Sequence, residues 1–484
     1  MGQLRIRSAL VTGANRGIGL GFVQHLLALP NPPEVLFAAC RDPKGQRAQE
    51  LQKLASKHRN LVIVPLEVTD PASIKAAAAS VGEHLKGSGL NLLINNAGIV
   101  RETTLDTETL KDMSEVYTTN TIAPLLLSQA LLPLLKKAAQ GSPGSGLSCS
   151  KAAIVNISSI VGSIKEMLLW EFAQCIAYRC SKAALNMLTR CQSLGYREHG
   201  ILCVTLHPGW VKTDMGNAAG HTAPQTVDAS IGGMLKVLSS LSEKDTGTFL
   251  DWEGNIVPWE ECDVCHVKCK LLLLQELQKL ASKHRNLVIV PLEVTDPASI
   301  KAAAASVGEH LKGSGLNLLI NNAALLKVNT LDTETLKDMS DVYTTNTIAP
   351  LLLSQALLPL LKKAAQGSPG SGLSCSKAAI VNISSSAGSI KEMLLWESEQ
   401  FLSYRCSKAA LNMLTRCQSL GYREHGILCI ALHPGWVQTD MGNSVGDKPP
   451  VTVDASVGGM LKVLSSLSEK DTGTFLDWEG NVVP

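Results

Sequence analysis

Short apolar runs alternate with longer amphipathic stretches along the first half of the chain, in the order strand, helix, strand, helix. Runs that are apolar throughout, rather than at every second position, are typical of parallel strands buried on both faces. The runs predict strands at Ala9–Thr12, Val35–Ala39, Leu61–Leu66, Leu90–Ile94, Ala153–Ile157 and Ile201–Leu206, with a short last strand near Phe249. We therefore expect an α/β fold in which helices cover both faces of a doubly wound parallel sheet.

Much of this pattern occurs twice. The run LQKLASKHRNLVIVPLEVTDPASIKAAAAS that starts at Leu51 returns unchanged from Leu277, and the match continues to Pro484. A repeat of this length indicates two tandem domains rather than a solenoid of short units. The second copy has no counterpart of residues 1–50. We predict a complete domain at 1–258, a linker at 259–274 and an incomplete second copy at 275–484.

The missing start has structural consequences for the second copy. It removes two strands and a helix, including the strand expected at the centre of the sheet. Apolar faces of the remaining strands are then uncovered, and the third strand loses its neighbour. We expect the second copy to be unstable alone, inactive, or dependent on the first copy. An alternative explanation of the joined chain is that two adjacent genes are read as one, with Trp259–Leu274 as non-native filler.

The composition fits packed domains and narrows the class of partner. The chain has 484 residues, 45% of them hydrophobic and 18% charged, and its formal net charge is +2. No long basic run occurs, so the sequence does not indicate a nucleic-acid surface or an anionic membrane surface. The first residues lack the apolar centre of a secretory signal, and no apolar run approaches the length of a membrane span. We expect a small-molecule partner, no nucleic-acid or membrane partner, and a cytoplasmic location.

The cysteines fall into two groups. Eight of the 13 occupy repeated positions, namely Cys149, Cys180, Cys191, Cys203, Cys375, Cys406, Cys417 and Cys429. Their surroundings predict free, mostly buried thiols. The junction WEECDVCHVKCK instead crowds together Cys262, Cys265, His266 and Cys269, in a C-x-x-C-H pattern that haem attachment or zinc binding would use. An export signal for haem attachment is lacking, and the spacing is tighter than that of paired zinc ligands, so we predict a solvated linker without a metal.

The first predicted strand runs directly into a glycine-rich turn, and a helical stretch follows. The turn reads Thr12-Gly13-Ala14-Asn15-Arg16-Gly17-Ile18-Gly19. Its glycines permit the tight turn, the close backbone approach and the helix-on-strand packing that place a pyrophosphate at a helix N-terminus. A tight turn by itself uses the same residue type, but the strand before it and the helix after it favour a Rossmann-type dinucleotide site. Only the first copy contains this turn, so only it is expected to bind a nucleotide by itself.

The glycine spacing resembles the TGxxxGxG turn of the short-chain dehydrogenase/reductase family. Further parts of that family's pattern follow in the same order: Asn95-Asn96-Ala97-Gly98 after the fourth strand, Asn120 in a helical stretch, Ser158-Ser159 after the fifth strand, Tyr178-Arg179-Cys180-Ser181-Lys182 at a helix start, and His207-Pro208-Gly209-Trp210-Val211-Lys212-Thr213-Asp214 after the sixth strand. The resemblance covers residues 1–258. The segments HPGWV and AALNMLTR are most similar to the sniffer and C-factor branch, which includes carbonyl reductase-like proteins.

Tyr178 is the candidate acid for reduction of a carbonyl group. Hydride delivery to a carbonyl develops negative charge on the oxygen, so the site needs an acid and a second donor there. A phenol is a poor acid at neutral pH unless a nearby cation favours its anion, and Lys182 lies one helical turn further on. The resemblance implies that Lys182 also grips the nicotinamide ribose, that Asn120 holds a water in the proton path, and that Ser159 hydrogen-bonds the substrate oxygen. The structural alternatives are a surface helix, a strand-end cap at Ser158 or Ser159, and an asparagine that bonds its own backbone.

The resemblance also implies which residues hold the dinucleotide. These are Gly13, Asn15, Arg16, Gly17, Ile18, Gly19, Arg41, Glu67, Val68, Asn95, Ala97, Gly98, Tyr178, Lys182, Pro208, Gly209, Val211 and Thr213. The catalytic set recurs in the second copy as Asn346, Ser385, Tyr404 and Lys408. The long helices at 109–137 and 177–199 form dimer interfaces in this family, so a homodimer or an intrachain pseudo-dimer is expected.

The end of the second strand favours NADP(H) over NAD(H). An NAD site places an acid there to bind the ribose hydroxyls, whereas an NADP site needs a cation for the added phosphate. Cys40 stands where the acid would be, Arg41 follows it, and Arg16 supplies a second cation on the same side. Asp42 is an opposing feature, because it would partly neutralise Arg41 or bond a ribose itself.

Together these residues predict an NADPH-dependent reductase of an aldehyde, ketone or quinone, active in residues 1–258. Before Tyr178, an apolar segment would wall a substrate pocket or pack against the neighbouring helix; its residues are Met167, Leu168, Leu169 and Trp170. One alternative function is a non-catalytic NADPH-binding sensor or signalling protein of the C-factor type. The other is an NAD-dependent oxidant of alcohols or steroids.

Overall fold

The computed structural model describes residues 4–142, 146–168, 170–171, 173–217, 222–258, 273–368, 372–393, 396–397, 400–444 and 448–483. The chain divides into two compact units. The first comprises residues 1–102, 114–258 and 331–336, and the second comprises residues 103–113, 259–330 and 337–484. Residues 259–272 of the predicted linker, with Cys262, Cys265, His266 and Cys269, lie outside the described residues.

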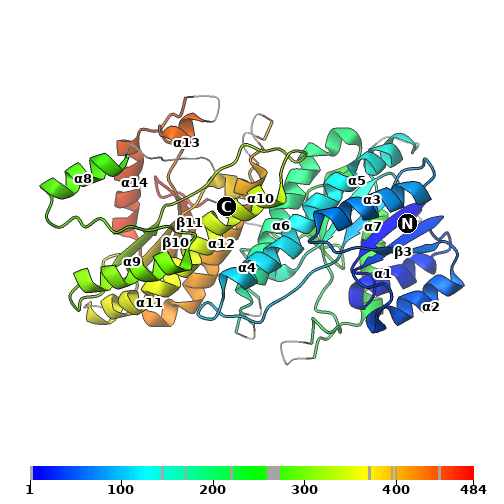
Figure 1. The fold of residues 1–484 in the computed structure, drawn as a ribbon, viewed down its shortest axis with the longest axis horizontal. Coiled ribbons are helices and arrows are strands. Elements are labelled where there is room, and N and C mark those ends of the chain that lie inside the picture. The colour runs from blue at the N-terminus through cyan, green and yellow to red at the C-terminus, as the bar shows by residue number, and fades with distance from the viewer. Residues whose placement is uncertain are drawn as a thin grey trace. The chain divides into compact units, whose positions relative to one another are not determined.

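The sheet of the first unit has seven parallel strands (Figure 1). They are β1 Ser8–Thr12, β2 Val35–Cys40, β3 Leu61–Pro65, β4 Leu92–Asn95, β5 Ala153–Ile157, β6 Leu202–His207 and β7 Phe249–Asp251. Their order is β3-β2-β1-β4-β5-β6-β7, so β1 lies between β2 and β4 and the chain winds outwards on both sides of it. The predicted doubly wound Rossmann-type sheet is confirmed, and each predicted strand agrees with the observed one to within two residues.

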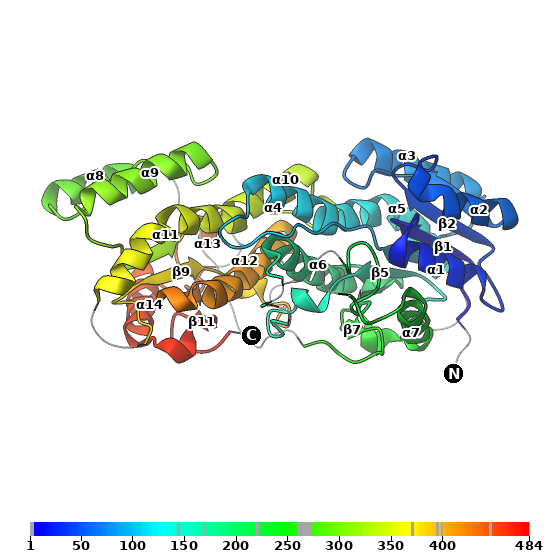
Figure 2. The same ribbon diagram turned by 90° about the horizontal axis from the view of Figure 1, so that it is seen from below.

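Helices cover both faces of this sheet (Figures 1 and 2). They are α1 Gly17–Leu27, α2 Gln49–Lys57, α3 Pro71–His84, α4 Leu110–Tyr117, α5 Ala123–Gln140, α6 Ile176–Gly195 and α7 Val227–Ser240, with a π-helical turn at Thr118–Ile122 and short 3₁₀ turns at Gln46–Ala48, Ile160–Gly162, Arg197–His199 and Glu243–Asp245. On one face, buried side chains of α1 and α7 pack on β1 and its neighbours, for example Phe22 and Ile231 with Val11. The strands are buried on both sides, which is why their sequences are apolar throughout.

The sheet of the second unit has four parallel strands, in the order β11-β10-β9-β8. The strands are β8 Leu318–Asn321, β9 Ala379–Ile383, β10 Leu428–His433 and β11 Phe475–Asp477. The helices are α8 Leu273–Lys283, α9 Pro297–His310, α10 Leu336–Tyr343, α11 Ala349–Gly367, α12 Leu402–Gly421, α13 Asp440–Asn443 and α14 Val453–Ser466, with a π-helical turn at Thr344–Ile348 and 3₁₀ turns at Ser386–Gly388, Arg423–His425 and Glu469–Asp471. β8 is therefore an edge strand, although its counterpart β4 is central.

The second unit differs from expectation at one more strand. Residues 287–291 repeat the sequence of β3, yet they form no strand. The sequence predicted only that this segment would lose its neighbour. A single strand without a partner has no backbone hydrogen bonds to hold it extended, so the loss of β1 and β2 also removes the third strand.

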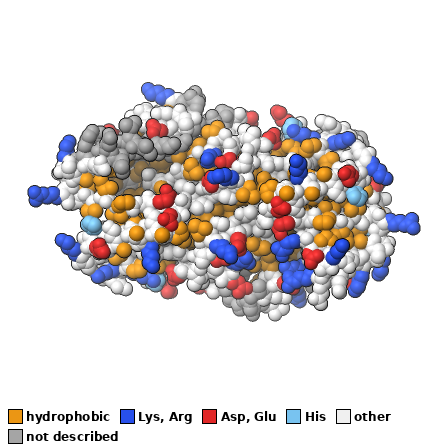
Figure 3. Space-filling view, in the orientation of Figure 1, with side chains coloured by type: hydrophobic (Ala, Val, Ile, Leu, Met, Phe, Trp, Pro, Cys, Tyr) orange, Lys and Arg blue, Asp and Glu red, His pale blue; other side chains and the backbone are white. Residues whose placement is uncertain are grey.

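Two features of composition can be compared with the structure. The eight repeated cysteines are not joined in disulfides, as predicted, and all but the half-buried Cys375 are buried. Contrary to the expectation that no apolar run approaches the length of a membrane span, the helical stretches 110–140 and 336–367 are long and apolar enough to cross a membrane; 56% of each apolar window is buried inside the protein. Acidic and basic side chains are interspersed on the face shown in Figure 3.

We expect the edge position of β8 to be visible in hydrogen exchange. β4 and β8 have the same sequence, LLIN, so their amides have the same intrinsic exchange rates. Because β8 has a partner on one side only, its amides should exchange about 100-fold faster than those of β4. Mass spectrometry can distinguish the copies through peptides that extend to Gly98 or to Ala324. Equal protection of the two strands would contradict the observed edge.

Candidate active site

The glycine turn follows β1 and opens α1. Gly13 and Gly17 have φ values of +63° and +54°, which favour glycine. A Cβ on Gly19 would lie 2.2 Å from the carbonyl oxygen of Gly13, so only glycine fits where the helix returns over the turn. No side chain caps the first turn of α1, and that turn contains no acidic residue. Its backbone N–H groups are thus suited to an anion such as a pyrophosphate.

Hydrogen bonds join the turn to the loop after β4. Oγ1 of Thr12 accepts from the backbone N–H groups of Asn96, at 2.9 Å, and Ala97, at 3.0 Å. The Asn96 side-chain amide donates to the carbonyl oxygen of Thr12 at 2.9 Å. Asn95, the last residue of β4, is buried and donates to the side chain of Asn156 on β5 at 2.8 Å. The ends of three adjacent strands are therefore fixed relative to one another.

The loop after β6 approaches the turn from another side. It carries Pro208, Gly209, Val211 and Thr213. A Cβ on Gly17 would lie 3.3 Å from Cγ2 of Thr213, and Arg16 forms an ion pair with Asp214. The structure thus brings this predicted cofactor loop to the glycine turn.

Asn120 lies in the π-helical turn at Thr118–Ile122 and is buried. Its Oδ1 accepts from the Ile99 N–H at 2.9 Å, and its Nδ2 donates to the Ile99 carbonyl at 2.9 Å and to Ser181 Oγ at 3.0 Å. The side chain therefore anchors the loop after β4 to α6. A Cβ on Gly98 in this loop would lie 3.2 Å from Oδ1 of Asn120 and 3.8 Å from Nζ of Lys182. These contacts favour a positioning role for the Asn120 side chain.

Tyr178, Lys182 and Ser159 converge at the start of α6. Nζ of Lys182 lies 5.5 Å from the centre of the Tyr178 ring and donates to the carbonyl of Ile157, the last residue of β5, at 2.8 Å. Tyr178 is half-buried and hydrogen-bonded with the Ser159 side chain. Ser158 instead points into the protein, where its Oγ is buried without a hydrogen-bond partner. This geometry favours Ser159 over Ser158, as the sequence predicts.

Burial controls the protonation of this group. It raises the pKa of Tyr178 to about 12, with Cys175 adding to the rise, although the hydrogen bond with Ser159 acts in the opposite direction. It also lowers the pKa of Lys182 to about 7. The pKa of Tyr178 is therefore raised rather than lowered as expected from Lys182, because burial disfavours the charged phenolate. Tyr178 thus keeps its proton at neutral pH, and burial favours the neutral form of Lys182 beside it.

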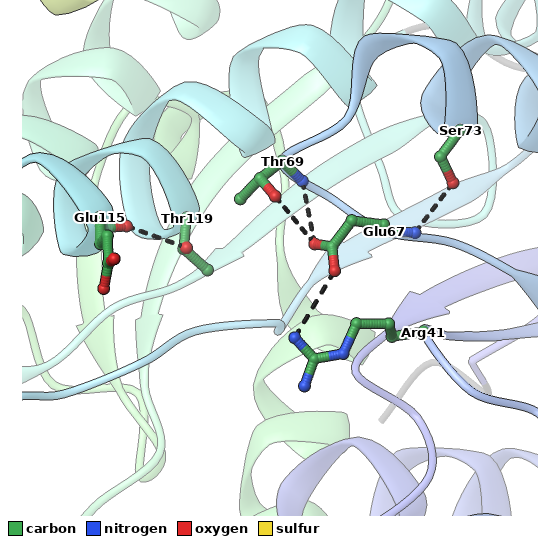
Figure 4. A network of polar contacts seen from close by, with 6 residues as sticks. All are labelled: Arg41, Glu67, Thr69, Ser73, Glu115 and Thr119. Atoms are coloured by element: carbon green, nitrogen blue, oxygen red, sulfur yellow. Dashed lines mark hydrogen bonds and ion pairs between the residues drawn. The ribbon is translucent and has the colours of Figure 1, made fainter. Parts of the chain in front are cut away.

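The far end of the site carries the predicted cationic residue Arg41. Nη1 of Arg41 lies 3.5 Å from Oε2 of Glu67, and Oε1 of Glu67 accepts from Thr69, so two predicted cofactor residues face each other (Figure 4).

The pKa of Cys40 is raised by burial and by Asp42, which keeps its thiol neutral. Oδ1 of Asp42 accepts a hydrogen bond from the backbone N–H of Lys44, so this carboxylate stabilises the turn after β2. Figure 4 also shows that Ser73 Oγ accepts a hydrogen bond from the backbone N–H of Glu67, and that Thr119 Oγ1 donates to the carbonyl of Glu115.

Arg179 is an important residue to which the sequence assigned no role. It is almost fully buried; Nε donates to Gln174 O at 2.7 Å, and Nη2 donates to Leu168 O at 2.9 Å. Its guanidinium also lies 5.6 Å from the ring centre of Trp170. Arg179 therefore holds the segment that precedes Tyr178. In the sequence, an arginine within an apolar helix face was the signal that could have indicated this buried role. Of the predicted pocket wall, Leu168 is exposed and Leu169 lies outside the described residues.

Comparison with known proteins agrees with this geometry. The sequence profile described as short chain dehydrogenase matches residues 7–224 and again residues 264–450. This chain belongs to the short-chain dehydrogenase family. A solved NADPH-bound carbonyl reductase from chicken fatty liver is 80% identical, with a TM-score of 0.53, covering 54% of this chain and 96% of that chain.

Two further relatives identify the branch of the short-chain dehydrogenases. The structure of carbonyl reductase Sniffer of Drosophila melanogaster is 39% identical, with a TM-score of 0.50, over 53% of this chain and all of that chain. C-signal of Myxococcus xanthus is 36% identical over 171 residues, which are 35% of this chain and 93% of that protein. The predicted sniffer and C-factor-like branch is confirmed.

The second short-chain dehydrogenase copy keeps several contacts of the predicted catalytic residues. Asn346 makes the same bonds to its loop and to Ser407, and Lys408 donates to the carbonyl of Ile383 at 2.8 Å and lies 5.5 Å from the ring centre of Tyr404. Ser385 is buried. Tyr404 lies in an apolar cluster with Leu326, Ala387, Phe401 and Met441. The copy thus has the predicted catalytic side chains without the glycine turn.

Gly19→Ala should weaken dinucleotide binding by tenfold or more. The new methyl group must displace the Gly13 carbonyl or the Asn96 amide, which would lie 2.7 Å away, and either shift distorts the turn. The matched control is Gly82→Ala in α3, where the added Cβ meets nothing within 4 Å. Calorimetric titration with NADPH measures both variants. Unchanged affinity in Gly19→Ala would show that this turn does not hold the dinucleotide.

Proposed function

We propose that residues 1–258 form an NADPH-dependent carbonyl reductase that acts on aldehydes, ketones or quinones. The observation that carries the proposal is the convergence of Tyr178, Ser159 and Lys182 within the same site as the glycine turn. The solved relative that is 80% identical was crystallised with NADPH and is itself named a carbonyl reductase. The free, buried thiols fit a reducing compartment such as the cytoplasm.

The chain supplies a fitting site for this cofactor. The uncapped first turn of α1 offers backbone N–H groups to the pyrophosphate, and Gly13, Gly17 and Gly19 allow close approach. The neutral thiol of Cys40 would not repel an additional phosphate, and the guanidinium of Arg41, 82% exposed, is available to bind it. This combination supports NADPH rather than NADH.

The catalytic roles follow from the protonation states. NADPH supplies the hydride for the carbonyl carbon. Tyr178 holds a proton at neutral pH and donates it to the carbonyl oxygen, while Ser159 donates a hydrogen bond to the same oxygen. The Lys182 ammonium stabilises the phenolate that Tyr178 becomes, and solvent then returns a proton. In total, one carbonyl group, one NADPH and one proton give one alcohol and one NADP⁺.

Tyr178→Phe is expected to lower the rate of NADPH oxidation with carbonyl compounds by about 100-fold or more, the usual contribution of a general acid. The matched control is Tyr404→Phe, which removes the same hydroxyl from the copy without a glycine turn and should leave the rate unchanged. A panel of aldehydes, ketones and quinones, with NADH in parallel, provides the assay. Full activity in Tyr178→Phe would contradict the role of Tyr178 as the acid, whereas NADPH binding without any turnover in the unaltered protein would favour the non-catalytic sensor or signalling protein. A preference for NADH would favour the alcohol or steroid oxidant.

The reduction rate should depend on pH through Lys182. Because its pKa is lowered to about 7, the ammonium that stabilises the phenolate is present below pH 7 and is lost as the pH rises above it. We expect kcat/KM for carbonyl reduction to fall by up to about tenfold per pH unit above that value. Lys182→Arg keeps the positive charge at all these pH values, so any activity it retains should lack this transition. A profile that is flat from about pH 6 to 9 in the unaltered protein would contradict the role of Lys182.

A further inference from the structure

Three apolar surfaces are exposed in the second unit although their counterparts in the first unit are covered. The first is the free edge of β8. Ile320 on this strand is 44% exposed, whereas the equivalent Ile94 on β4 is fully buried. The reason is that β4 pairs with β1, with Val11 opposite Ile94, whereas β8 pairs only with β9.

The second surface is the segment 287–291. Leu287, Val288 and Ile289 are between 38% and 46% exposed. In the first unit the same sequence is β3, which pairs with β2 in the register Leu36 to Leu61. The strand that covers this segment is again absent from the second copy.

The third surface is one side of α14. Val457 and Leu461 are 43% and 56% exposed, whereas the equivalent residues of α7, Ile231 and Leu235, are 0% and 7% exposed. In the first unit this side of α7 packs on α1, where a Cβ on Gly21 would lie 3.0 Å from Ile231. The partner of α7 is thus the helix that the second copy lacks.

One continuous segment accounts for all three surfaces. β1, α1 and β2 lie within residues 1–50, and they cover β4, α7 and β3 respectively. The second unit also has an apolar cavity of about 300 Å³. Its lining includes Val290 and Leu292, in and just after the segment 287–291, and Leu319 and Ile320 of β8. The uncovered surfaces are therefore the counterparts of those that a single strand–helix–strand unit covers in the first unit.

Polar groups at the edge match the same segment. In the first unit, Ser8 Oγ donates to the carbonyl of Gly89 at 2.8 Å, and Thr12 Oγ1 accepts from the N–H groups of Asn96 and Ala97. The second copy has the same residues at these places, as Gly315, Asn322 and Ala323. Both the apolar contacts and the hydrogen bonds of β1 are thus available in identical form.

We propose that the second unit is a docking site for a strand–helix–strand segment with the sequence of residues 1–50, supplied by a separate polypeptide. Addition of a strand to an exposed sheet edge is an established mode of recognition, with backbone hydrogen bonds giving affinity and side-chain pockets giving specificity. The chain's own residues 1–50 are held in the first unit, and moving them would open an identical edge there, so exchange within the chain gains nothing. The occupant is therefore a chain that presents this segment free.

Docking would also complete a second reductase site. The segment brings its glycine turn to the loop at Asn322 and Ala323, beside the retained side chains of Asn346, Tyr404 and Lys408. The reaction is the one proposed above, with one carbonyl, one NADPH and one proton consumed for each alcohol formed. This part rests on the proposed function, whereas the docking itself does not.

Docking is tested with the full-length chain and a fluorescently labelled synthetic peptide of residues 1–50. We expect saturable binding of one peptide per chain, and at least tenfold weaker binding to Ile320→Asp, which places a charge against the incoming β1. The control is Val482→Asp, because Val482 is 65% exposed and its counterpart Ile256 is 70% exposed in the first unit. No saturable binding, or equal binding to Ile320→Asp, would overturn the proposal. The second result would mean that the peptide replaces β1 of the first unit.

The second site is tested in the Tyr178→Phe chain, where the first site is inactive. Saturating peptide should raise its NADPH oxidation at least tenfold, and addition of Tyr404→Phe should abolish the gain. If the peptide binds but the gain is absent while the unaltered chain is active, the second site is overturned. If the unaltered chain is itself inactive with every carbonyl tested, the proposed function fails and the docking result stands.

A covalent variant guards against an insoluble peptide. Residues 1–50 are repeated between Glu276 and Leu277, which restores the order found in the first copy. We expect NADPH bound per chain to rise from one to two. A stoichiometry that stays at one, in a chain that folds, would show that the exposed surfaces do not accept the segment.

Discussion

The pairing of β1 with β2 on one side and β4 on the other is the interaction on which the rest of the structure depends. β1 ends at Thr12, whose hydroxyl ties the glycine turn to the loop after β4. In that loop, Gly98 lies against the side chains of Asn120 and Lys182. The dinucleotide turn and the catalytic side chains come from distant parts of the sequence, and this one central strand brings them to the same edge of the sheet.

The second copy shows what happens without that strand. The predicted catalytic side chains Asn346 and Lys408 keep their contacts because these are made with α12, β9 and the loop after β8, which the second copy retains. The edge strand β8, the segment 287–291 and α14 lose their cover instead. The catalytic set and the dinucleotide turn are thus structurally separable. A complete set of catalytic residues in a sequence is not sufficient evidence of an active site.

Desolvation is the main electrostatic influence at both copies of this set. Burial lowers the pKa of Lys182 and of Lys408 to about 7, because a buried ammonium loses its hydration. The same effect keeps Tyr178 protonated. Spacing along the helix correctly places a lysine beside the tyrosine, but it gives no measure of how much water reaches either group. The direction of the shift in Tyr178 therefore differed from the one expected.

The sequence by itself determined the strands, their parallel sheet and the position of the glycine turn, because apolar runs and glycines act over a few residues. It also identified Tyr178, Lys182 and Ser159 as one group. It missed the role of Arg179, whose partners lie in an irregular segment, and the anchoring bonds of Asn120. The clearest limit is LVIVP, which is a strand at Leu61–Pro65 and irregular at 287–291. Only tertiary structure decided this difference, because a strand is held by hydrogen bonds to a neighbour that its own residues cannot supply.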